Sequence, residues 1–351
     1  RSAAAVAKYI EEVGGSFFPF FGNNSIGLGV EVLPPDVDRA LAVLGEAILR
    51  PAFKPATFAL ERDAQVAALQ QDDDDVVTLA RKRLRERFFG PYPLALDAAG
   101  NQAGVKALLP SDLDALHRRL CVGSNVVLAV AGDLDPRRLR PKLEAMLARV
   151  PDGAAPACRR GGGGVQLPAE VGDFVEVQPR EQAVVLQAFP GPEVNAGDFY
   201  VGEVMDEVFS GMASRLFERV REEKGLAYFV RSARVTGLDT GMFYFLAGTQ
   251  PGREAEVLAE IDAEVARVQA GLVEPDELAR CLTRLKAARR QSLQTNSARA
   301  MQAGLNALQG QPVNDWKNYD AHVSAVTIPQ LAEFATRRFS RTQRTQLVVR
   351  P

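Results

Sequence analysis

An arginine and a tyrosine seven positions apart are the strongest candidates for chemistry in this 351-residue sequence. Arg221 and Tyr228 lie in the segment SRLFERVREEKGLAY, which begins as a charged helix and then meets a glycine. A guanidinium donates hydrogen bonds through a planar fork, and a phenol can donate one to a carbonyl oxygen or a developing oxyanion. Their spacing alone favours an ordinary surface arginine and a half-buried strand tyrosine. A functional role for the pair therefore depends on the sequence around it.

Two further residues of this segment bear on how the pair is positioned. Gly225 would let the chain turn out of the helix, because glycine adopts the left-handed conformation that ends many helices. Tyr228 would then begin a strand, and the pair would sit at one helix-to-strand corner. Arg215 is expected mainly to anchor the helix through a salt bridge, and it is a secondary candidate for the site.

Composition describes an ordinary globular chain. Hydrophobic residues make up 46% and charged residues 25% of the sequence, and the formal net charge is −2. That charge gives no electrostatic reason to expect nucleic acid or an anionic membrane as a partner. No apolar run approaches the roughly 18 residues of a membrane-spanning helix. The three cysteines are far apart and form no CxxC pair, which argues against a disulfide framework or a cysteine zinc site.

Helical and strand-like segments alternate along the chain. Apolar residues recur at helical spacing in 36–49 and in 253–268, which predicts one buried face for each helix. Strand-like runs occupy residues 25–33, 125–132, 182–189, 228–235, 241–248 and 344–350. Mixed strands and helices of this kind indicate an α/β or α+β fold.

A glycine- and proline-rich stretch at 151–172 is the predicted linker, and it divides the chain into 1–150 and 173–351. The two halves repeat each other at an offset of about 218–220, as Leu113 and Leu331 illustrate. This duplication predicts two similar units. Residues 173–213 hold a strand pair and a helix with no counterpart in the first half, so the sequence is expected to begin inside its first repeat.

These features resemble the M16 zinc metallopeptidases, the group of pitrilysin, insulinase and the mitochondrial processing peptidase. The segment GMASRLFERVREEKGLAYFVRSA at 211–233 is similar to the most recognisable part of that family's C-terminal half. LPSDLDAL and NVVLAVAGDLDP are similar to its N-terminal half. The resemblance implies an α+β fold of two similar units, each an antiparallel sheet with helices on one face, and two modules that enclose a chamber for unfolded peptides.

The resemblance also shows what is missing. An active M16 module carries HxxEH, whose histidines bind zinc and whose glutamate polarises the attacking water. No such motif occurs here, and its position would precede Arg1. The third zinc ligand, a glutamate of a later helix, falls on Gln70 or on Ala68, although an aspartate of 72–75 could substitute one to two turns away. We expect no metal site and no cofactor in this chain, with zinc held by a partner.

By resemblance, Arg221 and Tyr228 face that zinc across the chamber and hold the bound peptide. The expected protein is a subunit or half-module that is inactive alone and pairs with an HxxEH-bearing module to hydrolyse unfolded or extended peptides. Bacterial heterodimers of this kind are often exported, so analogy suggests the periplasm.

Other functions remain open at this stage. The chain could be a scaffold of the type found as core subunits of the cytochrome bc1 complex, or a chaperone that binds extended peptides. It could also be part of an active peptidase whose zinc helix lies upstream of Arg1. The intact pair Arg221 and Tyr228 favours the inactive subunit over a scaffold, and Gln70 argues against the active peptidase.

Overall fold

The computed structural model describes residues 1–156, 167–179 and 181–351, which form two compact units. The first unit comprises 1–67, 101–158 and 290–317, and the second comprises 68–100, 159–289 and 318–351. This division crosses the boundary predicted from the repeat, because each unit takes a segment from the other half of the sequence. Residues 157–166 of the predicted linker lie outside the described residues, and the strand β3 begins at its last residue, Gly172.

The first unit contains one hairpin and several helices. Its elements are α1 (Ala3–Glu11), β1 (Ser16–Phe21), β2 (Ile26–Glu31), α2 (Val37–Leu49), most of α3 (Pro55–Asp74), α5 (Gln102–Ala107), α6 (Pro110–Leu120), α7 (Pro136–Leu147) and α11 (Asn296–Leu308). Strands β1 and β2 pair antiparallel from Ser16 opposite Glu31 to Phe21 opposite Ile26. The helix predicted at 36–49 is confirmed as α2, which buries Ala40 and Val43.

The strand predicted at 125–132 is wrong. These residues follow the 3₁₀ turn η3 (Gly123–Asn125) without pairing to another strand, and Val127 and Val130 remain 41% and 43% exposed. A strand is stable only when a neighbour bonds its backbone groups. The matching strand of the second half pairs with 183–191, a segment that the first half does not repeat.

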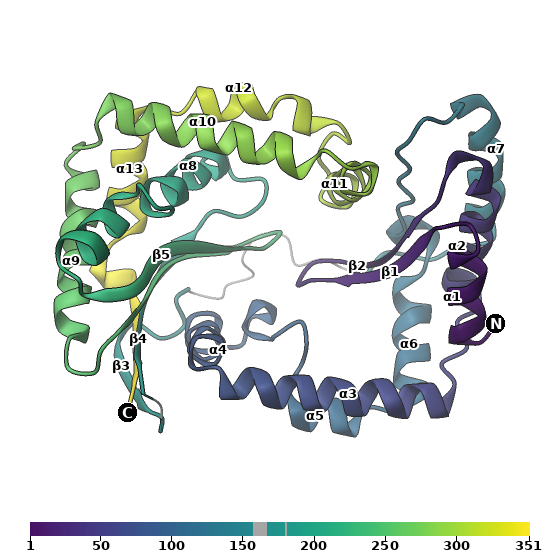
Figure 1. Ribbon diagram of the computed structural model, residues 1–351, viewed down its shortest axis with the longest axis horizontal. Coiled ribbons are helices and arrows are strands. Elements are labelled where there is room, and N and C mark those ends of the chain that lie inside the picture. The colour runs from purple at the N-terminus through teal and green to yellow at the C-terminus, as the bar shows by residue number, and fades with distance from the viewer. Residues whose placement is uncertain (157–166, 180) are drawn as a thin grey trace. The chain divides into compact units, whose positions relative to one another are not determined.

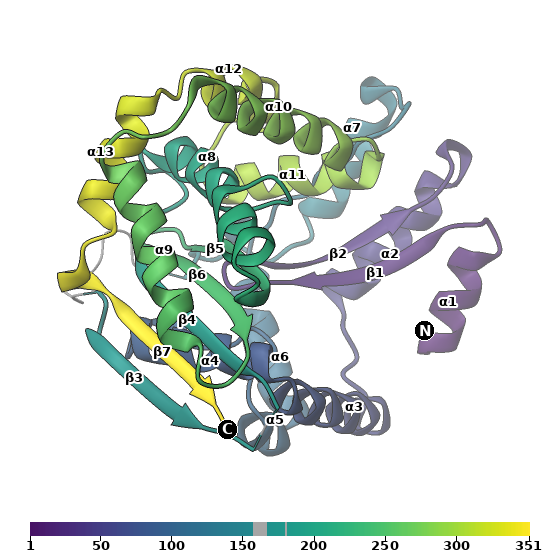
Figure 2. The same ribbon diagram turned by 60° about the vertical axis from the view of Figure 1, so that its left-hand side comes forward.

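The second unit is built on a five-stranded sheet with the order β3-β7-β4-β6-β5 (Figure 1, Figure 2). Its strands are β3 (Gly172–Val177), β4 (Ala183–Gly191), β5 (Ala227–Thr236), β6 (Gly241–Thr249) and β7 (Thr345–Arg350). Neighbouring strands are antiparallel except for β3 and β7, which run parallel. The predicted antiparallel sheet therefore needs this one correction, because β3 and β7 come from distant parts of the chain and no hairpin fixes their direction.

Helices cover both faces of this sheet. One face packs against α8 (Phe199–Phe209), α9 (Glu254–Gln269) and α13 (Ile328–Arg338), and the other against α4 (Val76–Phe89). Helices α10 (Pro275–Ser292) and α12 (Tyr319–Ser324) add side chains to the same core as α8, α9 and α13. The prediction of helices on one face is wrong because β4 and β6 are apolar on both sides. A strand that is buried on both faces needs cover on each.

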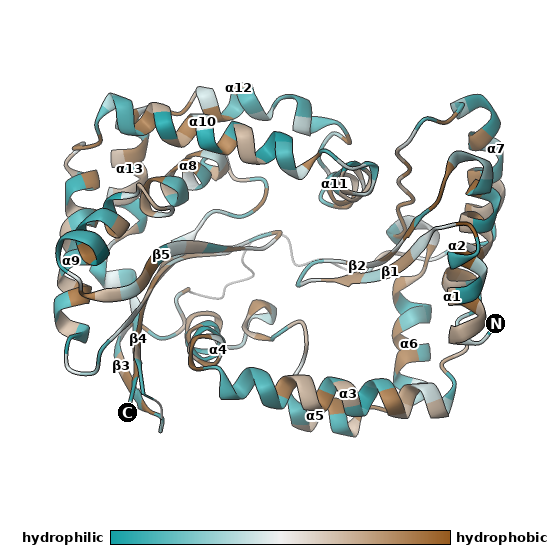
Figure 3. Cartoon of the chain, viewed as in Figure 1, coloured by the Kyte–Doolittle hydropathy of each residue, from teal (hydrophilic) through white to brown (hydrophobic). Residues whose placement is uncertain are grey.

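Hydropathy follows this arrangement. Figure 3 shows brown, hydrophobic residues along the sheet strands, whereas brown and teal turns alternate along α3. Of the α3 residues, only Leu69 is fully buried. Short 3₁₀ helices complete the described elements: η1 (Pro34–Asp36), η2 (Pro93–Ala95), η5 (Asp315–Lys317) and η6 (Arg341–Gln343). Across the described ranges, no helix is both long and apolar enough to span a bilayer.

Candidate functional site

Arg221 lies on a short π-helix, η4 (Phe217–Glu223), which leads into strand β5. The buried side chain of Val220 fixes this helix to the core. The guanidinium of Arg221 stacks on the ring of Phe217 at 4.7 Å, and its side chain is 46% exposed. Its ion-pair contact is a long one, 3.8 Å from Nε to Glu222 Oε1. Arg221 therefore holds a defined position and keeps donors accessible to a ligand.

Gly225 ends this helix in the left-handed conformation that the sequence predicts, with φ of 57°. Its N–H donates to the carbonyl of Arg221 at 3.0 Å, and the N–H of Leu226 donates to the carbonyl of Val220 at 2.9 Å. A Cβ at position 225 would meet no atom within 4 Å, so the backbone angle, and not space, is what favours glycine. The turn delivers the chain to β5 two residues later.

Tyr228 is the extra residue of a β-bulge. Ala227 pairs with Thr249 and Phe229 pairs with Gly248, so no residue of β6 lies opposite Tyr228. Its neighbour Ala227 is buried, whereas Tyr228 is 51% exposed. Bulges re-aim side chains and occur often beside active sites, and here the bulge turns a phenol outward from a strand that is otherwise largely covered.

Arg215 has a different role from Arg221. Its guanidinium pairs with Glu277 at 2.5 Å and Glu264 at 3.4 Å and donates to the carbonyl of Leu272 at 3.1 Å. The side chain is only 9% exposed. Burial raises the pKa of Glu264, and the charge of Arg215 opposes that rise. Arg215 thus ties the start of the segment to α9 and α10, as the sequence suggests.

A polar cluster behind β5 was not expected from the sequence. Ser232 Oγ donates to Asp206 Oδ1 at 2.5 Å, and the Ser232 N–H donates to Ser210 Oγ at 3.1 Å. Burial raises the pKa of the Asp206 carboxyl, although hydrogen bonds from the serines and the charge of Arg234 oppose this. The cluster joins α8 and the residue after it to the strand that carries Tyr228. Isolated serines and an aspartate gave no spacing signal for it.

Gln70 lies exposed on α3. Within the described ranges, no group of three or more histidine, cysteine, aspartate and glutamate residues could hold a metal ion. The aspartates at 72–75 end α3 and begin α4. Asp75 Oδ1 accepts the Thr78 N–H at 2.7 Å as the N-cap of α4, while Asp72 and Asp73 lie 3.5 and 3.4 Å from Lys82 Nζ. The acidic run therefore lies where one helix ends and the next begins.

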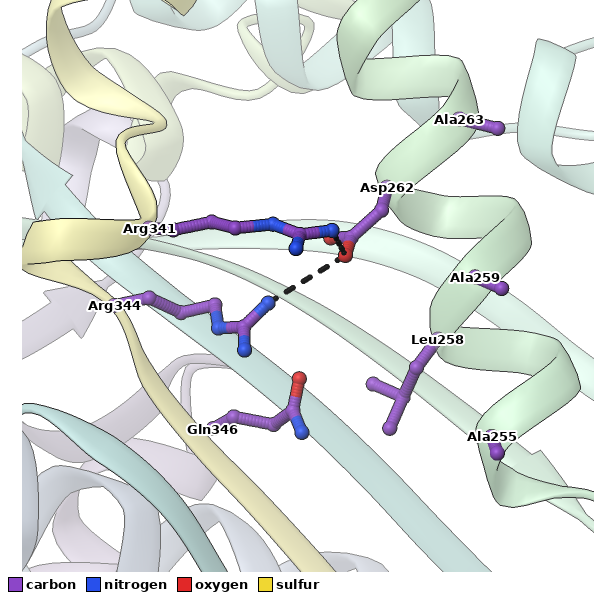
Figure 4. A pocket seen from close by; sticks show the side chains of 8 residues that line it. All are labelled: Ala255, Leu258, Ala259, Asp262, Ala263, Arg341, Arg344 and Gln346. Carbon is purple, nitrogen blue, oxygen red and sulfur yellow. Dashed lines mark hydrogen bonds and ion pairs between the residues drawn. The ribbon is translucent and has the colours of Figure 1, made fainter.

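A separate cavity of about 540 Å³ lies between α9 and the chain leading into β7 (Figure 4). None of its lining residues belongs to the Arg221 and Tyr228 segment.

The chain is a mixed α/β protein with a duplicated sequence, and its exposed Arg221 and Tyr228 lie at a helix-to-strand corner. The chain belongs to the M16 peptidase family: residues 108–285, about half of its length, match the family model of the peptidase M16 inactive domain.

Sequence relatives include bacterial proteins named as zinc proteases. The chain is 28% identical over 275 residues to an uncharacterized zinc protease of Mycobacterium leprae, which covers 76% of this chain and 60% of that protein. It is 27% identical over 293 residues to an uncharacterized zinc protease of Streptomyces coelicolor, and this alignment covers 82% of this chain and 63% of that protein. The chain therefore spans about three fifths of the length of these two relatives.

Solved structures show the same fold. A peptidase M16 inactive domain from Pseudomonas fluorescens matches with a TM-score of 0.88 at 19% identity, covering 100% of this chain and 84% of that one. A protease from Helicobacter pylori matches with a TM-score of 0.88 at 17% identity, covering 100% of this chain and 85% of that one. A chain of complex III2 from Candida albicans matches with a TM-score of 0.80 at 14% identity, covering 98% of this chain and 86% of that one.

Proposed function

We propose that this chain is a non-catalytic half of an M16 zinc peptidase that binds substrate peptide through Arg221 and Tyr228. A partner module with the HxxEH motif would hold zinc, which polarises the attacking water when bound. One observation carries the proposal. Two side chains able to donate hydrogen bonds are each about half exposed, although Val220, Leu226 and Ala227 beside them are buried.

The chemistry suits an extended peptide. Arg221 offers a guanidinium held against Phe217, whose planar fork can donate to a peptide carbonyl. Tyr228 offers a phenol O–H that can donate to a carbonyl oxygen or to an oxyanion formed at the scissile bond. The fixed turn at Gly225 sets the spacing between them. Because both groups bind substrate and neither activates water, this chain alone would not cleave peptides.

A scaffold function is the second candidate. The similarity to a chain of complex III2 supports it at the level of fold. A scaffold, however, gives no reason for a solvent-facing arginine on η4 close to a solvent-facing tyrosine on the bulged strand β5. The third candidate is part of an active peptidase that has its own zinc helix, and it is opposed by the amide Gln70 near the position of the third zinc ligand.

The test is reconstitution of peptide cleavage. The chain is mixed with a candidate HxxEH-bearing M16 protein and zinc, and hydrolysis of an unfolded peptide is followed. We expect cleavage only in the mixture, and we expect Arg221→Ala or Tyr228→Phe to lower its rate by about 10²-fold, the usual effect of losing one donor to a transition state. Arg219→Ala is the matched control, since Arg219 lies on the same helix at 45% exposure.

Two results would contradict the proposal. The first is chelator-sensitive cleavage by this chain alone. The second is an Arg219→Ala variant that loses as much activity as Arg221→Ala, which would show that the helix and not the guanidinium matters. Thermal unfolding midpoints of all variants must agree within a few degrees for the comparison to hold.

A further inference from the structure

The cavity between α9 and β7 is a solvent-open pocket, and its lining is separate from Arg221 and Tyr228. Figure 4 shows Arg341 and Arg344 reaching toward Asp262 of α9 across this space. The lining residues are Ala255, Leu258, Ala259, Asp262, Ala263, Arg341, Arg344 and Gln346. All of them belong to the second compact unit.

The charges of this cavity balance locally. Arg341 Nη2 lies 2.6 Å and Arg344 Nη1 3.5 Å from Asp262 Oδ2, and Arg344 Nη2 lies 2.8 Å from Asp173 Oδ1. Arg341 is 75% exposed, so its guanidinium can turn toward a ligand without losing a buried contact. Two arginines and one aspartate line the pocket, and Asp173, which pairs with Arg344 from outside the lining, brings the local sum of charges to zero. An isolated anion or cation would therefore be attracted by one sign of charge and repelled by the other. A ligand that carries both charges avoids this conflict.

A buried amide behind the lining has an unused acceptor. Gln187 is fully buried, and its Nε2 donates to Asp262 Oδ1 at 3.1 Å and to Gln346 Oε1 at 3.0 Å. The Oε1 of Gln187 has no hydrogen-bond partner among the described residues. A buried acceptor without a donor is unfavourable. A ligand that brings N–H groups to Asp262 and Gln346 could donate to Gln187 Oε1 after a small adjustment of the Gln187 and Gln346 amides.

The wall formed by α9 leaves room for a ligand. Ala255, Ala259 and Ala263 recur at intervals of four, so they lie along one face of the helix. Their side chains end at Cβ, and Leu258 adds an apolar edge. The pocket has a volume of about 540 Å³ and is open to solvent, so a small ligand could enter it without movement of the backbone.

We propose that this cavity binds a small zwitterion, namely a free α-amino acid or a dipeptide with small apolar side chains. Its carboxylate pairs with Arg341 and Arg344, its ammonium pairs with Asp262 and the neighbouring amide oxygens, and its side chain packs against the alanines of α9. The adjacent opposite charges of the protein match the adjacent opposite charges of an amino acid. This inference does not depend on the proposed peptidase function.

Calorimetric titration of the whole chain tests the proposal. The probes are L-alanine and L-alanyl-L-alanine, with sodium acetate and methylammonium chloride as single-charge ligands. We expect saturable zwitterion binding in about the millimolar range and at least tenfold weaker binding of either single-charge ligand. Whichever of the two zwitterions binds with the higher affinity shows whether the site prefers a free amino acid or a dipeptide.

Variants separate the site from general stability. Asp262→Asn and Arg341→Gln should each weaken binding at least tenfold. Ala259→Leu should abolish it by filling the cavity from an exposed position on α9. Arg337→Gln is the matched control, because Arg337 is an exposed arginine paired with Asp198 outside the cavity. Absence of saturable zwitterion binding overturns the proposal, as does acetate binding as tightly as alanine. An unchanged affinity in Ala259→Leu also overturns it.

Discussion

At the scale of single residues, the environment decides what an arginine does. Arg215 and Arg221 lie six positions apart in one segment, yet one is a buried anchor and the other a half-exposed donor. Arg215 has two glutamates and a carbonyl to satisfy its fork, whereas Arg221 rests on the ring of Phe217. Only the second can exchange its partners for a ligand at low cost, because breaking a buried ion pair leaves charge without compensation.

The turn at Gly225 gives a prediction for stability. Replacing Gly225 with alanine forces a Cβ into a backbone with φ of 57°, which should cost about 1 kcal/mol of unfolding free energy. Urea denaturation monitored by circular dichroism measures the loss. Gly197→Ala is the control, because a Cβ at either position meets no atom within 4 Å but only Gly225 has a positive φ. Equal losses in the two variants would show that the turn is not strained.

At the scale of elements, the acidic run at 72–75 joins two helices. Asp75 caps α4, and hydrogen bonds from Thr78 lower the pKa of its carboxyl below the ordinary 3.8. Asp74 instead ends α3, where a negative charge opposes the helix dipole. Replacing these two neighbouring aspartates should therefore change stability by different amounts.

Asp75→Ala should destabilise the protein by about 1 kcal/mol at pH 7 because the first turn of α4 loses its cap. A lowered pKa stabilises the fold above pH 3.8, and this stabilisation is lost as the pH falls through the folded-state pKa. The loss of unfolding free energy in Asp75→Ala, relative to the unmodified protein, should therefore become smaller as the pH falls below 3.8. Asp74→Ala removes a charge that opposes the dipole of α3, so it should destabilise the protein less than Asp75→Ala at pH 7. Urea denaturation at several pH values measures both, and a pH-independent deficit for Asp75→Ala would contradict the argument.

The same scale shows what sequence patterns can and cannot predict. Strands at 182–189, 228–235, 241–248 and 344–350 and the helix at 253–268 follow from local apolar periodicity, and all are present. The pattern at 125–132 is equally strand-like, but these residues have no neighbouring strand to pair with. Whether such a neighbour exists depends on residues far away in the sequence, so a local pattern cannot predict it. The parallel pairing of β3 with β7 and the cover of the second sheet face also depend on contacts between distant segments.

The candidate site was predictable only in part for the same reason. The glycine turn at 225 is encoded locally, so the helix end was predicted correctly. The bulge at Tyr228 depends on the register with β6, and the serine and aspartate cluster behind β5 depends on the packing of α8. The charged cavity between α9 and β7 joins residues about 80 positions apart, so no local spacing indicates it.

At the scale of the whole molecule, the repeats of the sequence are not the compact units of the fold. Helix α4 lies in the first half of the sequence, but it packs on the sheet formed by the second half. Leu84, Phe88 and Phe89 of α4 are fully buried and cover the sheet face that carries Leu186 and Leu246. The segment 68–100 is therefore part of the folding unit that carries Arg221 and Tyr228.

This arrangement predicts that residues 173–351 do not fold stably alone. Without α4, one face of the sheet would expose a row of large apolar side chains, and a patch of this kind promotes loose packing and association. The fragment should bind a hydrophobic dye, lack near-UV circular dichroism and unfold without a cooperative transition. Fusing residues 68–100 to it should abolish dye binding and restore both the near-UV circular dichroism and the cooperative transition, and the fusion with Leu84→Asp should do neither. Cooperative unfolding of 173–351 alone, with the midpoint of the fusion, would show that the sheet needs only one helical layer.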